Sequence, residues 1–148
     1  IQVFGLTSTL IYNNINMSSN KLIDVDNSKG SFILEGEKSE LKTDEIHIFG
    51  DIINGTFTTI NEVNEIDYLY VEDNEEANIV TSSMNLFALK AKYNKKENII
   101  ELFENVKVIR GAEIITGDYA NIDTLNETYK IKSNKKQKVK ALISNTDE

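Results

Sequence analysis

The strongest constraint on the fold is a hairpin pattern that occurs three times in this chain of 148 residues. Residues 25–34 (VDNSKGSFIL), 93–102 (YNKKENIIEL) and 122–131 (IDTLNETYKI) align without gaps. Each contains an apolar or aromatic residue, then Asp or Asn, a polar turn, and apolar residues at alternate positions. Because repeats of this length cannot bury an apolar face alone, the pattern predicts hairpins that stack around a shared core.

Alternation of apolar and other residues also runs through the segments between these repeats, and such alternation is typical of half-buried strands. In 66–71 it predicts that Ile66 and Tyr68 share a face with Tyr70, opposite Leu69 and Val71. We expect a degenerate repeat with a wider connection in 46–80. The breaks that predict turns are 26–30, 54–55, 72–76, 94–98, 110–111 and 123–127, which are rich in Asn, Asp and Gly.

The sequence predicts an all-β fold. Outside a short turn-like stretch at 37–42, no window carries the apolar stripe of a helix. Proline is absent, which suits long strands that use nearly every backbone N–H in pairing. The length fits one domain over residues 1–148. We expect an N-terminal segment with an edge strand in 1–18, and a basic C-terminal end with a final short strand in 134–148.

Composition excludes several classes of function. A net charge of -8 argues against a nucleic-acid partner, because phosphate backbones are bound by Lys and Arg. The absence of cysteine excludes disulfides, thiolate metal sites and cysteine nucleophiles. No run reaches the roughly 18 apolar residues of a membrane-spanning helix, and no basic-then-apolar signal peptide is present.

The sequence contains few candidate catalytic residues. The single histidine, His47, lies on an alternating strand between Ile46 and Ile48, so we expect a surface or rim side chain without converging partners. We also interpret Asp24 and Asp26 as outward polar positions rather than a catalytic pair. The acidic residues of 72–76 lack the spacing of a calcium loop, so a solvated turn is expected. The sequence predicts no enzyme activity, no cofactor and no metal site.

Residues 88–134 carry a more specific pattern. It comprises Ala91, the Tyr93–Asn94 turn, a strand with Ile100 and Leu102, the step Asn105, Val106 and Val108, and finally Gly117, Asp118 and Ala120. This order resembles the OstA-like domain of the LptA family of periplasmic lipopolysaccharide transport proteins. The resemblance is weaker over 19–36 and rests on strand pattern alone over 37–87. Asn105 stands where many relatives have glycine, so a positive φ is expected there.

The resemblance implies stacked antiparallel strands that form an open, twisted, incomplete β-jelly roll. It also implies a bridge in the periplasm that shields lipopolysaccharide (lipid A) acyl chains and pairs head to tail with other OstA-like proteins or with itself. Within the family, the chain looks most like the soluble bridge component. A trimmed periplasmic domain of the membrane-anchored, LptC-type component is the second choice, and an adaptor β-solenoid that binds only proteins is another alternative.

Two sets of residues would serve such a function. Apolar residues on one face of the strands would line the interior, either as an open trough for acyl chains or as an ordinary closed core. Strand edges at 129–132 would pair with a partner, unless their lysines protect the edge. The interior set is Phe32, Leu34, Ile46, Ile48, Phe57, Phe87, Leu89, Ile100, Leu102, Val106, Val108, Tyr129 and Ile131. The edge set is Tyr129, Lys130, Ile131 and Lys132.

Lysines gather toward the C-terminus, at Lys130, Lys132, Lys135, Lys136, Lys138 and Lys140, whereas 62–76 is acidic. If these stretches lay at opposite ends, opposite charge would steer head-to-tail association. The lysines would otherwise contact lipid A phosphates or act only as a solubilising fringe.

Overall fold

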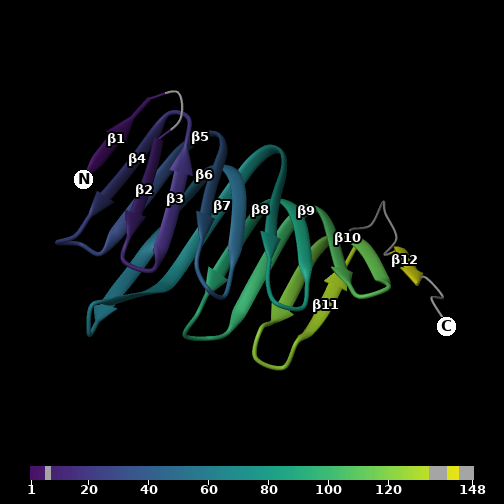
Figure 1. The fold of residues 1–148 in the computed structure, drawn as a ribbon. Coiled ribbons are helices and arrows are strands. Elements are labelled where there is room, and N and C mark those ends of the chain that lie inside the picture. Colours follow the sequence, from purple (N-terminus) through teal and green to yellow (C-terminus); the bar gives the residue numbers. More distant parts are fainter. Residues whose placement is uncertain (6–7, 134–139, 144–148) are drawn as a thin grey trace.

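The computed structural model describes residues 1–5, 8–133 and 140–143, and all of their regular secondary structure is β-strand (Figure 1). No helix in this part of the chain has the length and apolar character needed to cross a membrane. The strands are β1 (Gln2–Phe4), β2 (Ser8–Tyr12), β3 (Ile15–Ser19), β4 (Leu22–Asp26), β5 (Ser31–Lys42), β6 (His47–Ile60), β7 (Val63–Val80), β8 (Asn85–Asn94), β9 (Ile99–Arg110), β10 (Glu113–Asp123), β11 (Thr128–Lys132) and β12 (Lys140–Ile143).

These strands form one antiparallel sheet in the order β1-β4-β5-β6-β7-β8-β9-β10-β11. At each end the sheet branches, because β5 pairs with both β4 and β3, and β10 pairs with both β11 and β12. The two ends of the order do not pair with each other, so the sheet is not closed into a barrel. The N- and C-termini lie at opposite ends of the stack (Figure 1). The expected all-β, open jelly-roll architecture is confirmed.

Register shifts divide the long strands into two layers. They fall between residues 35 and 39 of β5, 49 and 52 of β6, 72 and 77 of β7, 87 and 90 of β8, and 117 and 119 of β10. Irregularities of this kind bend a strand and increase its twist. The first layer contains β1, β4, β11 and the strand halves that bear the repeated turns. The second layer contains β2, β3, β12 and the other halves.

The three repeats are three equivalent hairpins of the first layer. Val25 pairs with Phe32, Tyr93 with Ile100, and Ile122 with Tyr129, so the aligned positions share one register. Asp26, Asn94 and Asp123 each accept backbone N–H bonds from their own turn. The last turn residues, Gly30, Asn98 and Glu127, all have positive φ. The repeat is therefore a physical unit in which Asp or Asn fixes the turn.

The expected degenerate repeat is the hairpin of β6 and β7. The prediction that its two strands have a wider connection is wrong. Ile60 pairs with Val63, and the turn consists of Asn61 and Glu62, with φ values of 53° and 66°. Two consecutive residues with positive φ are the hallmark of the tight hairpin turn whose twist matches the strands. The length of this unit lies in its strands rather than in its turn.

Two other predicted turns are also wrong, because β6 continues through 54–55 and β7 through 72–76. Gly55 lies inside β6 opposite Leu69, and a Cβ atom there would meet the Tyr68 carbonyl oxygen at 2.1 Å. Gly55 therefore allows close packing between strands beside Phe32, and it does not form a turn. Residues 72–76 form the bend of β7, and the turn-like stretch 37–42 is strand.

Bulges also change which side chains share a face. A register shift between Thr56 and Phe57 adds one residue to β7, which places Ile66 with Leu69 in the core and leaves Tyr68 exposed. The predicted faces of 66–71 are therefore wrong at this point. Strand β9 continues through Asn105, which has the expected positive φ of 52°.

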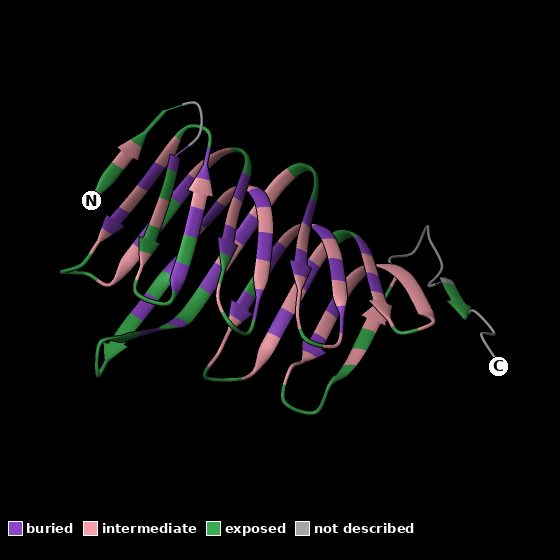
Figure 2. Ribbon diagram, viewed as in Figure 1, coloured by how far each residue is buried: buried purple, intermediate pink, exposed green. Residues whose placement is uncertain are grey.

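One apolar cluster fills the space between the layers and runs along most of the stack (Figure 2). Phe57 of the first layer contacts Tyr12 of the second in an edge-to-face arrangement, with ring centroids 5.5 Å apart. The first 18 residues form β1, β2 and part of β3. Of the C-terminal end, β12 is described, and Lys135, Lys136 and Lys138 lie outside the described residues.

Candidate functional site

The apolar interior contains most of the residues expected to line it. Nine of the predicted side chains are buried between the layers, and two from β11, Tyr129 and Ile131, are half-buried against the same cluster. The nine are Phe32, Leu34, Ile46, Ile48, Phe57, Ile100, Leu102, Val106 and Val108. These nine residues belong to one continuous apolar interior, which is filled by the side chains of the core cluster.

Phe87 and Leu89 do not belong to this interior, and their assignment is corrected. Their neighbours Leu86 and Ala88 point inward and are fully buried, so Phe87 and Leu89 lie on the outer face of β8. There the Phe87 ring lies 4.7 Å from the Lys107 ammonium nitrogen. The sequence around Phe87 is apolar at consecutive positions, so alternation alone does not distinguish its two faces.

Other interior residues were missed. Some of them, such as Ile66 and Ala88, lie beside a bulge or have a small side chain, and both features weaken a hydrophobic alternation signal. Ala91 and Ala120 occupy equivalent hairpin positions opposite Leu102 and Ile131, so the repeat itself could have identified them. The missed residues are Ile15, Met17, Ile23, Val25, Leu41, Ile53, Ile66, Leu69, Val71, Ala77, Ile79, Met84, Leu86, Ala88, Ala91, Tyr93, Ala120 and Ile122.

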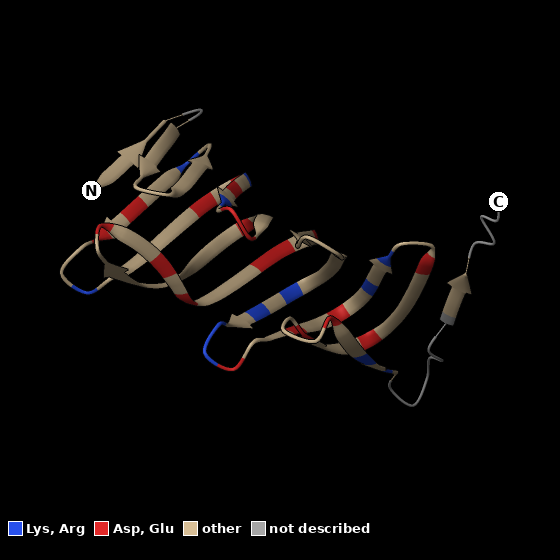
Figure 3. Ribbon diagram, turned by 60° about the horizontal axis from the view of Figure 1, so that its bottom comes forward, with Lys and Arg blue, Asp and Glu red and all other residues tan. Residues whose placement is uncertain are grey.

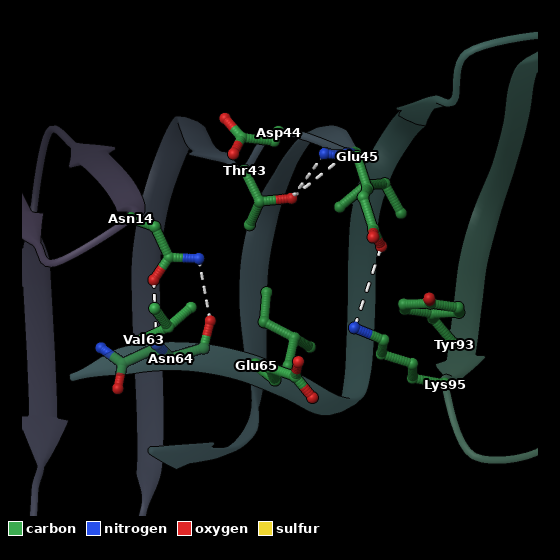
Figure 4. Close-up of a pocket in the computed structure, with 11 residues that line it drawn as sticks. Asn14, Thr43, Asp44, Glu45, Val63, Asn64, Glu65, Tyr93 and Lys95 are labelled. Atoms are coloured by element: carbon green, nitrogen blue, oxygen red, sulfur yellow. Dashed lines mark hydrogen bonds and ion pairs between the residues drawn. The ribbon is translucent and has the colours of Figure 1, made fainter. Parts of the chain in front are cut away.

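The hairpin ends of the two layers face each other along a line that we call the mouth. A pocket of about 180 Å³ lies in it, between the 43–46 turn of the second layer and β7 and β8 of the first (Figure 4). The buried side chains of Ile46, Ile66 and Tyr93 form its apolar floor, and burial raises the pKa of Tyr93. The rim is polar. The lining residues are Asn14, Thr43, Asp44, Glu45, Ile46, Val63, Asn64, Glu65, Ile66, Tyr93 and Lys95.

At its N-terminal side the mouth is joined by paired hydrogen bonds between Asn14 and Asn64, the N-terminal clasp. The Asn14 side chain donates to the Asn64 carbonyl at 2.9 Å and accepts from the Asn64 backbone N–H at 2.9 Å (Figure 4). Asn64 is buried, and its side-chain oxygen accepts a bond from the Thr59 hydroxyl at 2.5 Å. Buried groups that lose such partners cost the fold substantially, so this clasp is a strong closure.

In the middle, the mouth is spanned by an ion pair between Glu45 and Lys95, with the charged atoms 3.9 Å apart. The Glu45 side chain is 72% exposed, so water and salt screen the attraction. Pairs of this kind contribute roughly 0–1 kcal/mol. The middle of the mouth is therefore weakly closed.

Toward the C-terminus, the mouth is joined by a C-terminal clasp of Arg110, Glu113, Glu127 and Tyr129. The Arg110 guanidinium donates to the Glu127 carbonyl at 2.9 Å and contacts the Glu113 carboxylate at 3.1 Å. The Tyr129 hydroxyl donates to the same carboxylate at 2.5 Å. The hydrogen bond from Tyr129, with the help of Arg110, lowers the pKa of Glu113. Burial and the Glu113 carboxylate raise the pKa of Tyr129.

This clasp predicts an acid-sensitive contribution to stability. Because the folded state lowers the pKa of Glu113, its contribution is present above the ordinary value of 4.5 and is lost as the pH falls through the folded-state pKa. We expect Glu113→Gln to lower the urea midpoint at pH 7 and to reduce the further loss below pH 4.5. Urea titrations across this pH range measure both effects.

The exposed carboxylate Glu97 provides the control for this experiment. Glu97→Gln should leave the urea midpoint and its pH dependence close to wild type. An unchanged acid response in Glu113→Gln would contradict a role for the clasp in stability.

The apolar interior is not covered at the two ends of the stack. At the C-terminal end, the half-buried Ile131 of β11 packs against the cluster without a further strand beyond it in the described chain (Figure 2). At the N-terminal end, Val3 and Leu10 are likewise partly buried and pack against the cluster. Lys130 and Lys132 lie on the outer face of β11 and are exposed. The predicted edge set therefore combines two inward and two outward side chains.

The predicted charge asymmetry between the ends is wrong. The acidic stretch 62–76 belongs to the turn before β7 and to β7 itself, in the middle of the sheet order. Acidic residues occur along the length of the stack (Figure 3). The N-terminal edge strands β1 and β2 carry no charged side chain, and they expose Phe4 and Ile11 instead. The N-terminal edge therefore exposes apolar rather than charged side chains.

The remaining candidates for chemistry have structural partners. His47 lies on the outer face, where it contacts Glu40 at 2.5 Å and the Phe49 ring at 4.3 Å. Asp24 accepts a bond from Gln2. Hydrogen bonds from Ser28 and Lys29 to Asp26 lower its pKa. Within the part of the chain that the structure covers, no group of three or more His, Cys, Asp or Glu side chains is arranged to hold a metal ion.

No family model and no curated protein matches the sequence. Among solved structures, the fold is similar to that of LptH from Pseudomonas aeruginosa, with a TM-score of 0.72. That protein is described as the LptA-homologous periplasmic component of the conserved lipopolysaccharide transport device. The similarity covers 91% of this chain and 100% of that chain, at 12% sequence identity. The two chains therefore share one fold, the open jelly roll of LptA-like proteins.

Proposed function

We propose that this chain is a periplasmic lipopolysaccharide-binding bridge, which holds lipid A acyl chains in its apolar interior and joins partner OstA-like domains by strand pairing. The observation that carries the proposal is the fold shared with LptH over nearly the whole chain. The continuous apolar interior supports it, because one cluster extends from Ile15 in β3 to Ile122 in β10.

Acyl chains suit such an interior. Burial of each methylene contributes roughly 0.8 kcal/mol and needs no directional partner, so a chain held this way can slide. In the present conformation side chains occupy the interior, so lipid binding requires the layers to separate. The energy for directional transport would come from another component.

The two uncovered ends support strand pairing. Each end presents backbone N–H and C=O groups on edge strands next to uncovered apolar side chains, a combination that pairs readily with another strand. We propose that the edge at 129–132 receives the N-terminal edge of an OstA-like partner or of a second copy.

The alternative function is an adaptor that binds only proteins, and the filled interior favours it. A domain whose core is fully packed needs no lipid to complete it. The periplasmic domain of a membrane-anchored, LptC-type component is a further alternative that shares the lipid-binding interior and the paired edges.

Photocrosslinking distinguishes these functions. We expect a photoreactive amino acid at Ile131, which faces the interior, to capture lipopolysaccharide. The same group at Lys130, the outward neighbour, should capture a protein partner and little lipid. Capture is measured by gel shift with antibodies against lipopolysaccharide after irradiation in cells.

The adaptor predicts a different result. If crosslinkers at Ile131 and at the buried Leu102 never capture lipopolysaccharide while Lys130 captures a protein, the lipid-binding bridge is contradicted. Circular dichroism of each purified variant establishes that the β fold is intact.

A further inference from the structure

One part of the mouth has no polar closure. The turn 81–84, between β7 and β8, makes its hydrogen bonds within itself, from Thr81 to the Met84 carbonyl and from the Met84 N–H to the Thr81 hydroxyl. Among the residues that the structure describes, no hydrogen bond or ion pair joins this turn to the first layer. Elsewhere along the mouth, the two clasps and the Glu45–Lys95 pair make that connection.

A cavity of about 400 Å³ occupies this gap. Ile46, Tyr93 and Ile100 are buried and form its floor, so it reaches directly to the apolar interior. Hydroxyl and amide groups lie around its rim, together with the charged side chains of Asp44, Glu45 and Lys95. The lining residues are Asp44, Glu45, Ile46, Thr81, Ser82, Tyr93, Lys95, Asn98, Ile100, Thr124 and Leu125.

Leu125 adds an apolar residue to this rim. It lies in the turn between β10 and β11, whose neighbouring residues Thr124 and Asn126 are polar, and it is 72% exposed. The turn does not need a leucine at this position, because Asp123 fixes it through bonds to the Leu125 and Asn126 backbone N–H groups. An exposed apolar side chain at the entrance of an apolar cavity offers a first contact for an acyl chain.

The neighbouring closures are unequal. On the C-terminal side stands the C-terminal clasp, with hydrogen bonds to a carbonyl and a carboxylate. On the N-terminal side stands the solvent-exposed Glu45–Lys95 pair, which contributes little. The layers therefore separate most easily between these two points.

We propose that this section of the mouth, between turns 81–84 and 124–127, is the lateral portal through which acyl chains enter the interior. The proposal rests on the proposed lipid-binding function and adds the place of entry. The N-terminal clasp stays closed during entry, and Leu125 makes the first apolar contact.

Crosslinked variants test the portal. The chain has no cysteine, so introduced thiols are unique. Ser82→Cys with Thr124→Cys spans the portal, since both residues line its cavity and Leu125 is left in place. Thr43→Cys with Val63→Cys is the matched control across the mouth beside the N-terminal clasp, since both residues line the smaller pocket and neither makes a bond of the clasp. Each pair is joined by a short thiol crosslinker that a reductant cleaves, and uptake of fluorescent lipopolysaccharide is followed over time.

We expect the portal crosslink to slow uptake at least about tenfold, with recovery on reduction, and the control crosslink to leave uptake unchanged. Uptake at the normal rate through a crosslinked portal overturns the portal while the lipid-binding function stands. Equal inhibition by both crosslinks also overturns it, because the whole mouth would then have to open. If the uncrosslinked protein takes up no lipopolysaccharide, the proposed function itself fails.

A second measurement tests the portal even if the thiol crosslinks form in low yield. Nitroxide labels on the same cysteine pairs report distance distributions across the mouth. Added lipopolysaccharide should widen the distribution between 82 and 124 and leave that between 43 and 63 unchanged. Widening between 43 and 63 alone would place the entry toward the N-terminal end and overturn the portal.

Discussion

Phe32→Ala is expected to lower the free energy of unfolding by about 3–5 kcal/mol, the usual cost of removing a buried aromatic side chain from a packed core. Phe32 is fully buried and stacks on Phe57 with ring centroids 6.4 Å apart, and a Cβ atom added at Gly55 would lie 3.0 Å from its ring. Because glycine at 55 leaves no side chain to move into the space, the cavity would collapse little. Guanidinium denaturation followed by circular dichroism measures the loss.

The neighbouring Ile33 provides the control, since it points outward on the same strand and is 41% exposed. Ile33→Ala should cost less than about 1 kcal/mol, as is usual for surface positions away from special contacts. Similar losses in the two variants would contradict the assignment of Phe32 to the interior.

Asn14→Ala is expected to destabilise the fold by at least about 2 kcal/mol, because it removes both hydrogen bonds of the N-terminal clasp. The variant leaves the N–H and C=O of the buried Asn64 without their partner. These groups then either stay unpaired or draw water into the interior beside Tyr12 and Phe57. The same denaturation experiment measures the effect.

Asn16, on the adjoining strand β3, is exposed and serves as the matched control. Asn16→Ala should change the free energy of unfolding by less than about 0.5 kcal/mol. If Asn14→Ala proves equally mild, the clasp does not hold the layers together, and the N-terminal part of the mouth would open as readily as the rest.

Sequence reasoning succeeded where structure is local. The turns after Asp26, Asn94 and Asp123 were predictable because a side-chain acceptor four or fewer residues away fixes each one. The pairing register followed, since a hairpin's turn sets its register. Most of the interior set could be derived in the same way from alternation counted from those turns.

Several of the failures arise at bulges. A single extra residue at Asp67 reverses the alternation of β7, and nothing in its composition distinguishes it from a regular strand position. The bend at 72–76 and the Asn-Gly pair at 54–55 also resembled turns, although β7 and β6 continue through them. Consecutive apolar residues around Phe87 made its outward orientation indistinguishable from an inward one.

The contacts across the mouth were not accessible to pattern reasoning. Asn14 and Asn64 are 50 residues apart, and each taken alone resembles an ordinary turn or strand residue. Only the folding of the sheet over itself brings them together. The contact between Arg110 and Glu127 was equally hidden from the sequence pattern. It forms only because the turn between β10 and β11 returns to the end of β9.

The branching of the sheet at β5 and β10 has a mechanical consequence. The N-terminal end terminates in the short strands β1 and β2, and the C-terminal end in β11 and β12, so the two edges at each end belong to separate layers. A junction that paired both edges of one end with another chain would be bivalent, because after one contact forms the second becomes intramolecular at high effective concentration. Such a junction tolerates bending between segments, because one contact can open while the other holds, and it is dismantled in two small steps rather than one large one.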